Sequence, residues 1–282
     1  MKHVVAIYRA ERFSPNSVEK DRAIIEAVGK RLAQKGYEVE YISECELDES
    51  HEADIYLSMG RLASTIDFLK HKEDEGAITI NTAEGVESCS RSEIDRIMRI
   101  NGIPAAPMSG TDGYWIKRGD EAAQSKDDVV YARNAAEKEE RIKAFRQRGI
   151  SDIVVTAHLK GDLVKFYGVQ GTGFFRMFYP SDDGQYKFED EKMNGCAYHY
   201  AFNSESLHKD AERLSTLTGA EIYGGDCIVG ENGTYAIIDF NDWPSFSRCL
   251  NDAAYAIVER VMMKINMRTK ADNMAYAKET MA

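Results

Sequence analysis

Short apolar runs alternate with amphipathic stretches through about the first 80 residues, and this alternation restricts the possible folds more than any other feature. The run His3–Tyr8 predicts a buried strand. A helix is expected to begin at Asn16, with Ile25, Val28 and Leu32 at helical spacing. Further strands are expected over residues 37–42, 54–58 and 77–81, with a helix over residues 62–72. The order of strands and helices predicts a small parallel sheet with helices packed on it.

The pattern changes after about residue 100. Residues 90–101 predict a helix with Ile94, Ile97 and Met98 on one stripe. From residue 114 onward, strands separated by glycine turns dominate, which predicts an α+β region rich in antiparallel hairpins. Three more helices are expected, over residues 135–148, over Ser204–Thr218 with Leu207, Ala211, Leu214 and Leu217 on one face, and over residues 249–265, leaving residues 267–282 as a polar tail.

Composition excludes several classes of protein. The chain has 282 residues, enough for about two domains. Its hydrophobic fraction of 43% and charged fraction of 29% are typical of a globular protein. The net charge of −11 argues against a nucleic-acid partner. The first apolar run is too short for a secretion signal, and no stretch reaches the ~18–20 apolar residues of a membrane span, so we expect a cytoplasmic protein. The five cysteines are scattered, which predicts neither a disulfide framework nor a zinc site.

A β-hairpin is predicted near the C-terminal end, where Gly-Glu-Asn-Gly at residues 230–233 separates two apolar runs. A turn closed by the two glycines places Asp226 opposite Ile237, and a two-residue Asn-Gly turn places it opposite Asp239. In either register Asp226, Asp239 and Asn241 share one face of the hairpin. Two carboxylates and an amide oxygen suit Mg²⁺. Because Asp239 lies in the apolar run Ala-Ile-Ile-Asp-Phe, an unpaired charge there would be costly, and this favours a bound cation.

This arrangement of Asp226, Asp239 and Asn241, with Pro244 close behind, resembles the metal-binding end of the ATP-grasp superfamily. In that superfamily an acid on one strand and an E-x-N or D-x-N motif on the next bind Mg-ATP. The resemblance covers about residues 1–265 and is to carboxylate–amine ligases of the glutathione synthetase and D-alanine–D-alanine ligase type. It implies ATP and Mg²⁺ as cofactors. It also implies a small Rossmann-like N-terminal domain over residues 1–84 and a two-lobed ATP-grasp module over residues 85–266, with a small lobe at about 104–157 and a large lobe at about 158–266.

The resemblance also implies which residues contact the nucleotide. Lys117 resembles the lysine that ends the first strand of the small lobe and contacts phosphate. Arg91 stands where many members have a first lysine. Residues 153–168 look like the hinge between the lobes, whose backbone binds adenine and whose next strand offers a polar group to the ribose. The cofactor contacts expected from this hinge are Thr156, Ala157, His158 and Asp162.

The sequence departs from the family pattern at three places. Residues 156–158 replace the usual hinge acid, and no glycine-rich loop follows Lys117. Gly224 stands where an arginine often precedes the first metal-binding acid. The cation that stabilises the transferred phosphoryl group is therefore expected to be Lys165 or Arg176.

The resemblance favours an ADP-forming ligase, in which ATP phosphorylates a carboxylate and an amine attacks the acyl phosphate. Mg²⁺ and nearby cations would carry the charge of the transferred group, so no side-chain nucleophile is needed. Arg248 would clamp the carboxylate, with Ser245 in the same loop. The acceptor, a small molecule or a peptide, is also expected to touch Arg9, Arg12 and Ser14, because this loop follows the first strand of an open α/β sheet.

Other readings remain open. A small-molecule kinase on the same fold would leave a stable phosphate ester, and a nucleotide-binding module would bind ATP without chemistry. A dehydrogenase is disfavoured because residues 8–12 lack the glycines that a pyrophosphate would need. We expect neither a nucleic-acid nor a membrane partner, and a homodimer is left open.

Overall fold

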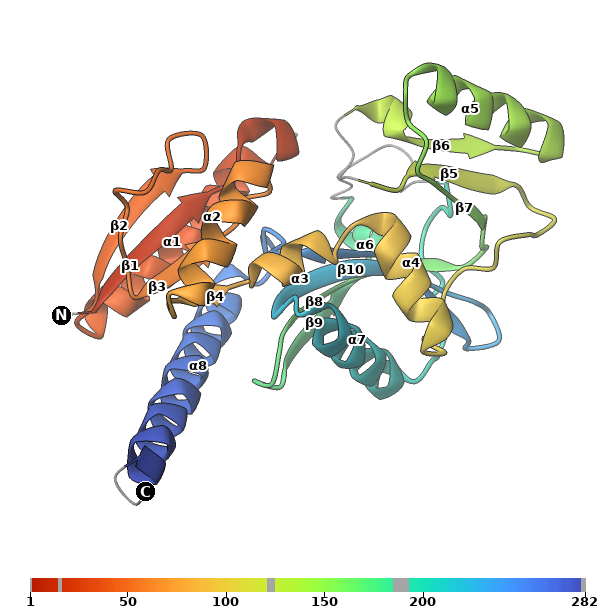
Figure 1. The fold of residues 1–282 in the computed structure, drawn as a ribbon. Helices are drawn as coiled ribbons and strands as arrows, with labels where there is room; N and C mark the ends of the chain where they lie inside the picture. Colours follow the sequence, from red (N-terminus) through yellow and green to blue (C-terminus); the bar gives the residue numbers. More distant parts are fainter. Residues whose placement is uncertain (1, 15–16, 121–124, 185–192, 280–282) are drawn as a thin grey trace.

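The computed structural model describes residues 2–14, 17–120, 125–184 and 193–279. Within these residues the strands form three sheets, which Figure 1 shows together with the helices that cover them. One sheet is parallel and the other two are antiparallel. This mixture agrees with the predicted combination of α/β and α+β regions. None of the helices within the described ranges is long and apolar enough to cross a membrane.

The N-terminal sheet is parallel, as predicted, with strand order β2-β1-β3-β4. Its strands are β1 (His3–Tyr8), β2 (Glu38–Ser43), β3 (Ile55–Ser58) and β4 (Ile78–Ile80), and its helices are η1 (Glu11–Phe13), α1 (Val18–Gln34), α2 (Ala63–Asp74) and α3 (Ala83–Glu87). Helix α1 begins at Val18 with Ser17 at its N-cap position, two residues later than predicted. Asn16, the expected cap, lies outside the described residues.

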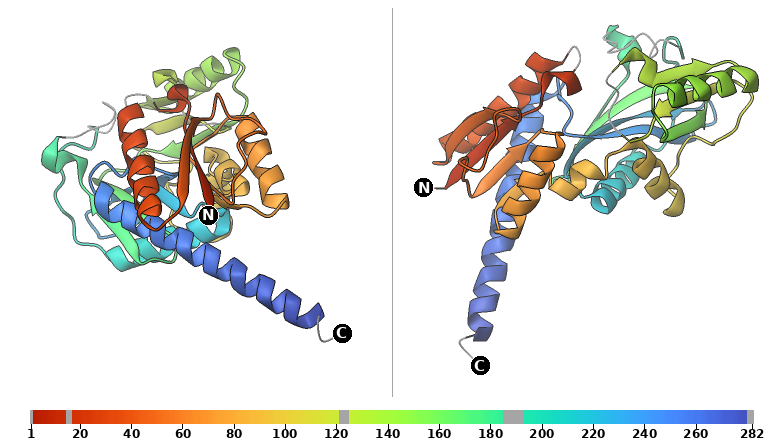
Figure 2. Two further views of the ribbon diagram at one scale, coloured as in Figure 1. Left: turned by 90° about the vertical axis from the view of Figure 1, so that its left-hand side faces the viewer. Right: turned by 45° about the horizontal axis from the view of Figure 1, so that its top comes forward.

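Helices cover both faces of this sheet. Successive residues of β1 point to opposite faces, so they belong to two different apolar clusters. Val5 and Ile7 pack with α2 and α3 in one apolar cluster. Val4 and Ala6 pack in another cluster with α1 and the C-terminal helix α8 (Leu250–Glu279). The prediction that the last helix ends near residue 265 was wrong, because α8 continues through most of the expected tail. Figures 1 and 2 show its C-terminal part extending away from the rest of the chain.

A three-stranded antiparallel sheet follows, with strand order β6-β5-β7. It consists of β5 (Tyr114–Arg118), β6 (Val129–Ala132) and β7 (Ile153–Ala157), with η2 (Lys126–Asp128) before β6 and helix α5 (Ala135–Gln147) between β6 and β7. Helix α5 covers one face, where Phe145 packs with Ile116. The residues of the other face, Lys117 and Thr156 among them, line a pocket shared with the next sheet.

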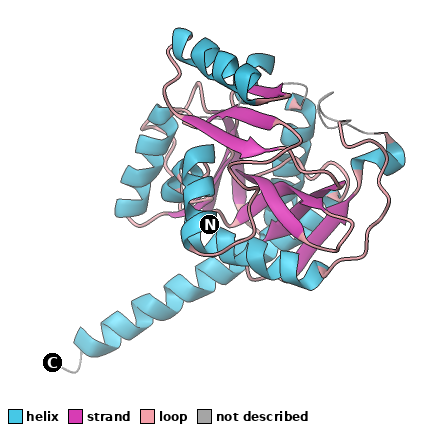
Figure 3. Ribbon diagram, turned by 90° about the vertical axis from the view of Figure 1, so that its right-hand side faces the viewer, coloured by secondary structure: helices cyan, strands magenta, loops and turns pink. Residues whose placement is uncertain are grey.

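The last sheet has four antiparallel strands in the order β11-β10-β8-β9. The strands are β8 (Asp162–Val169), β9 (Phe174–Phe178), β10 (Ile222–Val229) and β11 (Tyr235–Asp242), and the helices around them are α4 (Arg91–Ile100), α6 (Pro180–Asp183) and α7 (Ser204–Thr218). Figure 3 shows the strands lying between helices that cover them. The buried stripe of α4 is the predicted one. On α7, however, Leu217 is 42% exposed, while Ser215 and Thr218 are buried in its place.

Candidate nucleotide and metal site

The hairpin of β10 and β11 brings Asp226 opposite Asp239. Neither predicted register holds along its whole length. Near the turn Cys227 lies opposite Ile237, and a bulge at Ile238 then shifts the pairing by one residue. The bulge therefore places the two carboxylates side by side, and Asn241 follows Asp239 on the same face.

Basic side chains surround the two carboxylates. Lys165, on the neighbouring strand β8, places Nζ 3.0 Å from Oδ1 of Asp226. Nε of Arg91 lies 3.7 Å from Oδ1 of Asp239. Burial raises the pKa of Asp239, but the charges of Arg91 and Lys117 outweigh it and lower that pKa below the usual carboxyl value. Asp239 is therefore ionised at neutral pH, as a metal ligand must be.

The donor set of this site suits Mg²⁺ in particular. Across the part of the chain that is described, no three His, Cys, Asp or Glu side chains gather in a group that could hold a metal ion without help. Mg²⁺, however, takes one or two carboxylates and completes its shell with phosphate oxygens and water. Asp226 and Asp239, with the amide oxygen of Asn241, fit that pattern. In the structure the amide nitrogen of Asn241 donates to Oδ2 of Asp239 at 2.9 Å, so the amide has to turn over to offer its oxygen to an ion shared with that carboxylate.

Lys117 connects the two antiparallel sheets. It lies in β5, and its Nζ donates to the carbonyl oxygen of Ile238 in β11 at 2.8 Å. Burial lowers the pKa of Lys117 below the usual lysine value, and the charge of Asp239 partly opposes this. Arg91, at the start of α4, also donates to the carbonyl oxygen of Arg118 at 3.3 Å. Two cations from different elements therefore converge on Asp239.

A pocket lies between β5 and β7 of one antiparallel sheet and β11 of the other, beside α4, and we call it the interlobe pocket. It is lined by both polar and apolar residues. The polar residues are Arg91, Asp95, Lys117, Thr156 and Asp239, and the apolar ones include Ile94, Met98, Val154 and Phe240. Its volume is about 30 Å³, which is room for about one water molecule. A ligand of nucleotide size needs several hundred Å³ (about 300–1,000 Å³). We therefore expect the two sheets to move apart when a nucleotide binds.

In the expected hinge, Thr156 lines the interlobe pocket. The backbone N–H groups of the next two residues donate hydrogen bonds to other parts of the chain. The N–H of Ala157 donates to the carbonyl oxygen of Pro107 at 2.7 Å, and the N–H of His158 donates to that of Gly113 at 2.9 Å. The indole of Trp115 donates to Nδ1 of His158 at 3.1 Å. Burial lowers the pKa of His158, so the ring is neutral and carries its proton on Nε2. The groups of this segment that can meet a base are therefore its carbonyl oxygens and Nε2 of His158.

Asp162 has another role than the expected ribose contact. Its side chain is buried, and its two oxygens accept the N–H groups of Tyr198 and Tyr200 at 2.7 and 2.8 Å. Asp162 therefore anchors the loop before α7. Its partners lie more than 35 residues away in the sequence, so no local pattern signals this role.

Gly224 stands where related sequences often have an arginine, and its neighbours across the sheet explain why a side chain is absent there. Gly224, Tyr167 and Arg176 lie opposite one another on β10, β8 and β9. A Cβ at Gly224 would lie 2.8 Å from Cγ of Pro244 and 3.0 Å from Cδ1 of Tyr167, so no side chain fits there. Of the two expected replacements, Lys165 contacts Asp226, whereas Arg176 lies 3.6 Å from the exposed Asp252. The geometry favours Lys165.

The expected carboxylate clamp, Arg248, lies over the ring of Phe178 and donates to Asp183 at 2.7 Å. Ser245, in the same loop, is half-buried. Sequence reasoning missed Tyr167, which is half-buried and close enough to Lys165 and Arg248 to feel their charges; burial raises its pKa to about 12. Its position two residues after Lys165 was the available signal, because alternate residues of a strand share a face.

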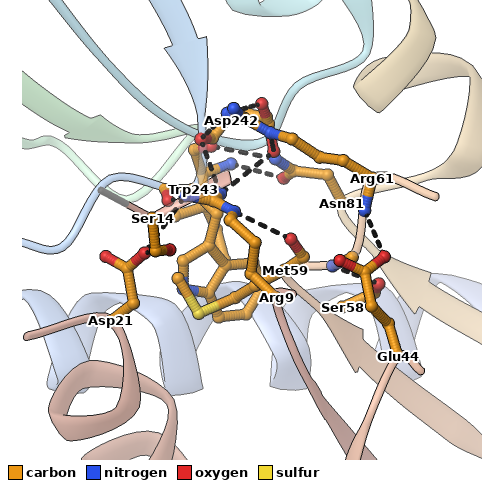
Figure 4. A network of polar contacts seen from close by, with 12 residues as sticks. Arg9, Ser14, Asp21, Glu44, Ser58, Met59, Arg61, Asn81, Asp242 and Trp243 are labelled. Atoms are coloured by element: carbon orange, nitrogen blue, oxygen red, sulfur yellow. Dashed lines mark hydrogen bonds and ion pairs between the residues drawn. The ribbon is translucent and has the colours of Figure 1, made fainter. Parts of the chain in front are cut away.

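Within its described residues, the loop after β1 does not form the open anion site that was expected. Arg9 is buried and donates to the carbonyl oxygens of Met59 and Trp243 at 3.0 and 3.1 Å. The hydroxyl of Ser14 donates to Asp21. Both residues are therefore already engaged by the chain, while Arg12 is exposed and lies over the ring of Phe13. Figure 4 shows Arg9 and Ser14 within this set of contacts.

Sequence reasoning also missed the charged cluster that surrounds Arg9. We call this cluster the junction network, and it comprises Arg9, Asp21, Glu44, Arg61 and Asp242 (Figure 4). Buried Glu44 accepts the N–H groups of Ala10, Arg61 and Leu62 at 2.6–2.8 Å. The five members lie in or directly after five different elements, so no local motif indicates them.

The fold has counterparts among solved structures. D-alanine–D-alanine ligase from Bacillus anthracis matches with a TM-score of 0.64 at 11% identity, over 97% of this chain and 100% of that one. The same ligase complexed with ATP matches with a TM-score of 0.62 at 13% identity, again over 97% and 100%. A RimK domain ATP-grasp protein from Sphaerobacter thermophilus matches with a TM-score of 0.61 at 16% identity, over 92% and 99%. No protein-family model and no curated protein matches the sequence.

Proposed function

Since the chain has the ATP-grasp fold, we propose that it is an ATP- and Mg²⁺-dependent ligase that activates a carboxylate for attack by an amine. The observation that carries the proposal is that Asp226, Asp239 and Asn241 lie together on one hairpin, and that Lys117 and Arg91 converge on Asp239 at the interlobe pocket. The Bacillus anthracis neighbour is a ligase, and one of its structures holds ATP, which supports the same cofactor here.

The proposed reaction has two steps. A carboxylate oxygen of the first substrate attacks the γ-phosphorus of ATP, and ADP leaves as the acyl phosphate forms. The amine of the second substrate then attacks the acyl carbon, and phosphate leaves with the electrons of the broken bond. Bound Mg²⁺ would neutralise phosphate charge during the first step.

The chain's own residues supply the remaining stabilisation. Lys117 and Arg91 hold phosphate oxygens from one side of the interlobe pocket, and Lys165 faces the transferred group from β8. Such preorganised charges act strongly where water is excluded. Arg248 and Ser245 bind the carboxylate, beside Tyr167.

We further propose how the chain is divided into domains, where the enzyme works and which loop contacts the acceptor. Residues 1–84 form a Rossmann-like domain, residues 85–266 form the two-lobed module, and the enzyme works in the cytoplasm. The acceptor is a small molecule or a peptide. Because Arg9 and Ser14 are engaged in the protein, acceptor contacts are assigned to the loop of residues 243–248 and not to the loop after β1.

A screen of amino acids and amines for ADP release, followed by mass spectrometry of the product, tests the proposal. Asp226→Asn and Asp239→Asn should each lower turnover by at least about a hundredfold while the circular dichroism spectrum is unchanged, because each removes charge from the metal site and not packing. Asp74→Asn, on the exposed surface of α2, is the matched control and should keep full activity.

The outcomes separate the ligase from its rivals. An amide product with one ADP released per bond supports the ligase. A stable phosphate ester would replace it with a kinase, and ATP binding without any ADP release would leave a nucleotide-binding module. Near-normal turnover of Asp239→Asn would refute the metal assignment.

A further inference from the structure

Asp242 lies next to the metal pair but faces the other way. It ends β11, directly after Asn241, and successive residues of a strand point to opposite faces. Its side chain is only 3% exposed, so its charge is removed from solvent. Asp242 therefore cannot share a ligand with Asp239 and Asn241, and it needs its own compensation.

Two arginines of the N-terminal part provide that compensation. Arg61 donates to Oδ1 of Asp242 and, through Nε, to Oδ2 at 3.3 Å. Arg9 donates to Oδ2 at 3.4 Å. Both arginines also reach backbone: Arg61 donates to the carbonyl oxygen of Asp242 at 3.4 Å, and Arg9 to that of Trp243 at 3.1 Å. Figure 4 shows the two guanidinium groups gathered at the end of β11.

The arginines are themselves fixed at the carboxyl end of the parallel sheet. Arg9 follows β1 and pairs with Asp21 of α1 at 3.3 Å. Arg61 follows β3, and its N–H donates to Glu44, which follows β2. Buried charges that are paired from several sides permit few alternative arrangements, because moving one leaves another uncompensated.

Two further contacts join the same segments. Trp243, fully buried, packs in the apolar cluster that contains α1 and α8. The buried amide of Asn81 exchanges two hydrogen bonds with the backbone of Ile222, at 2.7 and 2.9 Å, where β10 begins. The start of β10 and the end of β11 are thus both tied to the N-terminal part.

We propose that Asp242 is a positioning residue, which uses Arg9 and Arg61 to set the place of Asp239 and Asn241 and so couples the metal site to the N-terminal loops. The inference rests on the proposed nucleotide site. A coupling of this kind is reciprocal: if the loops hold the metal ligands in place, a bound Mg²⁺-nucleotide also steadies the loops.

Hydrogen exchange of the full-length protein, with and without Mg²⁺ and a non-hydrolysable ATP analogue, tests the coupling. In the unaltered protein the nucleotide should slow exchange in β5 and α4, which touch the interlobe pocket, and also in residues 59–62, by about fivefold or more. In Arg61→Gln the slowing at residues 59–62 should disappear while that in β5 and α4 remains. Arg22→Gln, an exposed arginine on α1, is the matched control and should behave as the unaltered protein.

A second measurement gives a readout that a merely structural role would not change. The Mg²⁺ concentration needed for half-maximal binding of the analogue should rise about tenfold in Asp242→Asn, because the metal ligands lose their fixed place, while analogue binding without Mg²⁺ stays the same. Arg61→Lys keeps the positive charge but has a single donor nitrogen, so it should raise the Mg²⁺ requirement less than Arg61→Gln does. If Arg61→Gln does not fold, Asp242→Asn and Arg61→Lys decide the question.

Failure of the coupling differs from failure of the proposed function. Slower exchange in β5 and α4 with none at residues 59–62 in the unaltered protein would overturn the role of Asp242 and leave the nucleotide site standing. The same Mg²⁺ requirement in Asp242→Asn and the unaltered protein would also overturn it. No slowing anywhere would remove the nucleotide site itself, and the inference with it.

Discussion

Lys117 shows how burial sets the charge of a group that faces phosphate. Its ammonium group is buried and donates to the carbonyl oxygen of Ile238, and burial lowers its pKa below the usual lysine value. A lysine attracts phosphate only while it is protonated. Below the lowered pKa the charge is present, and above it the charge is lost.

We therefore predict that Mg-ATP affinity falls as the pH rises through this lowered pKa, at a lower pH than an ordinary lysine would give. Calorimetric titrations from pH 7 to pH 10.5 measure it. Lys117→Arg should show no such fall, since a guanidinium stays charged throughout, and Lys117→Ala should bind weakly at every pH. Identical pH curves for the unaltered protein and Lys117→Arg would contradict the prediction.

Single residues could be predicted from the sequence where the relevant pattern is local. Asp226, Asp239 and Asn241 follow from the alternation of a strand, and the structure brings them together. The buried ion pair of Arg9 could not be predicted from such a local pattern. The sequence shows its charge, but its partner Asp242 is 233 positions away, and a buried ion pair leaves no local signature.

The bounds of helices and strands were predicted best where apolar residues recur at regular spacing. Strand β1 and helix α7 have the expected bounds, since each buries a regular set of side chains. About the last four turns of α8 were missed because polar residues continue the helix without a hydrophobic period. The bulge in the β10–β11 hairpin was missed because either simple turn satisfied the same alternation.

The packing of α8 leads to a prediction about stability. Ile257 is fully buried in the cluster that joins α8 to α1 and β1, whereas Met267 is 56% exposed. Ile257→Ala should lower the free energy of unfolding by about 2–4 kcal/mol, because it leaves a cavity. Met267→Ala should change it by less than about 0.5 kcal/mol. Urea unfolding followed by circular dichroism measures both, and equal effects would mean that α8 does not pack as described.

At the scale of the whole molecule, the two antiparallel sheets close over a pocket of about 30 Å³. The bond from Lys117 to Ile238 spans the closed gap. Because a nucleotide needs a larger space than this pocket, we expect the two sheets to separate before binding, and the open form to be populated only in part without ligand.

This order of events predicts that the observed rate of nucleotide binding levels off at high concentration, at the rate of opening. Stopped-flow fluorescence of Trp115, which shares a face of β5 with Lys117, measures it with the non-hydrolysable analogue and Mg²⁺. Trp115→Phe is the control that removes the signal. A rate that rises linearly with concentration up to the diffusion limit would rule out obligatory opening.

The position of α8 has a consequence for how the chain is made. One face of the N-terminal sheet is covered first by α1 and completed by α8, so the cover is incomplete while the intervening residues, from Glu87 to Leu250, are being synthesised. At about 5–20 residues per second this lasts roughly ten seconds or longer. Through that interval the apolar side chains that α8 later covers on α1 and β4 stay exposed on the ribosome, and the N-terminal sheet finishes folding only after α8 has been made.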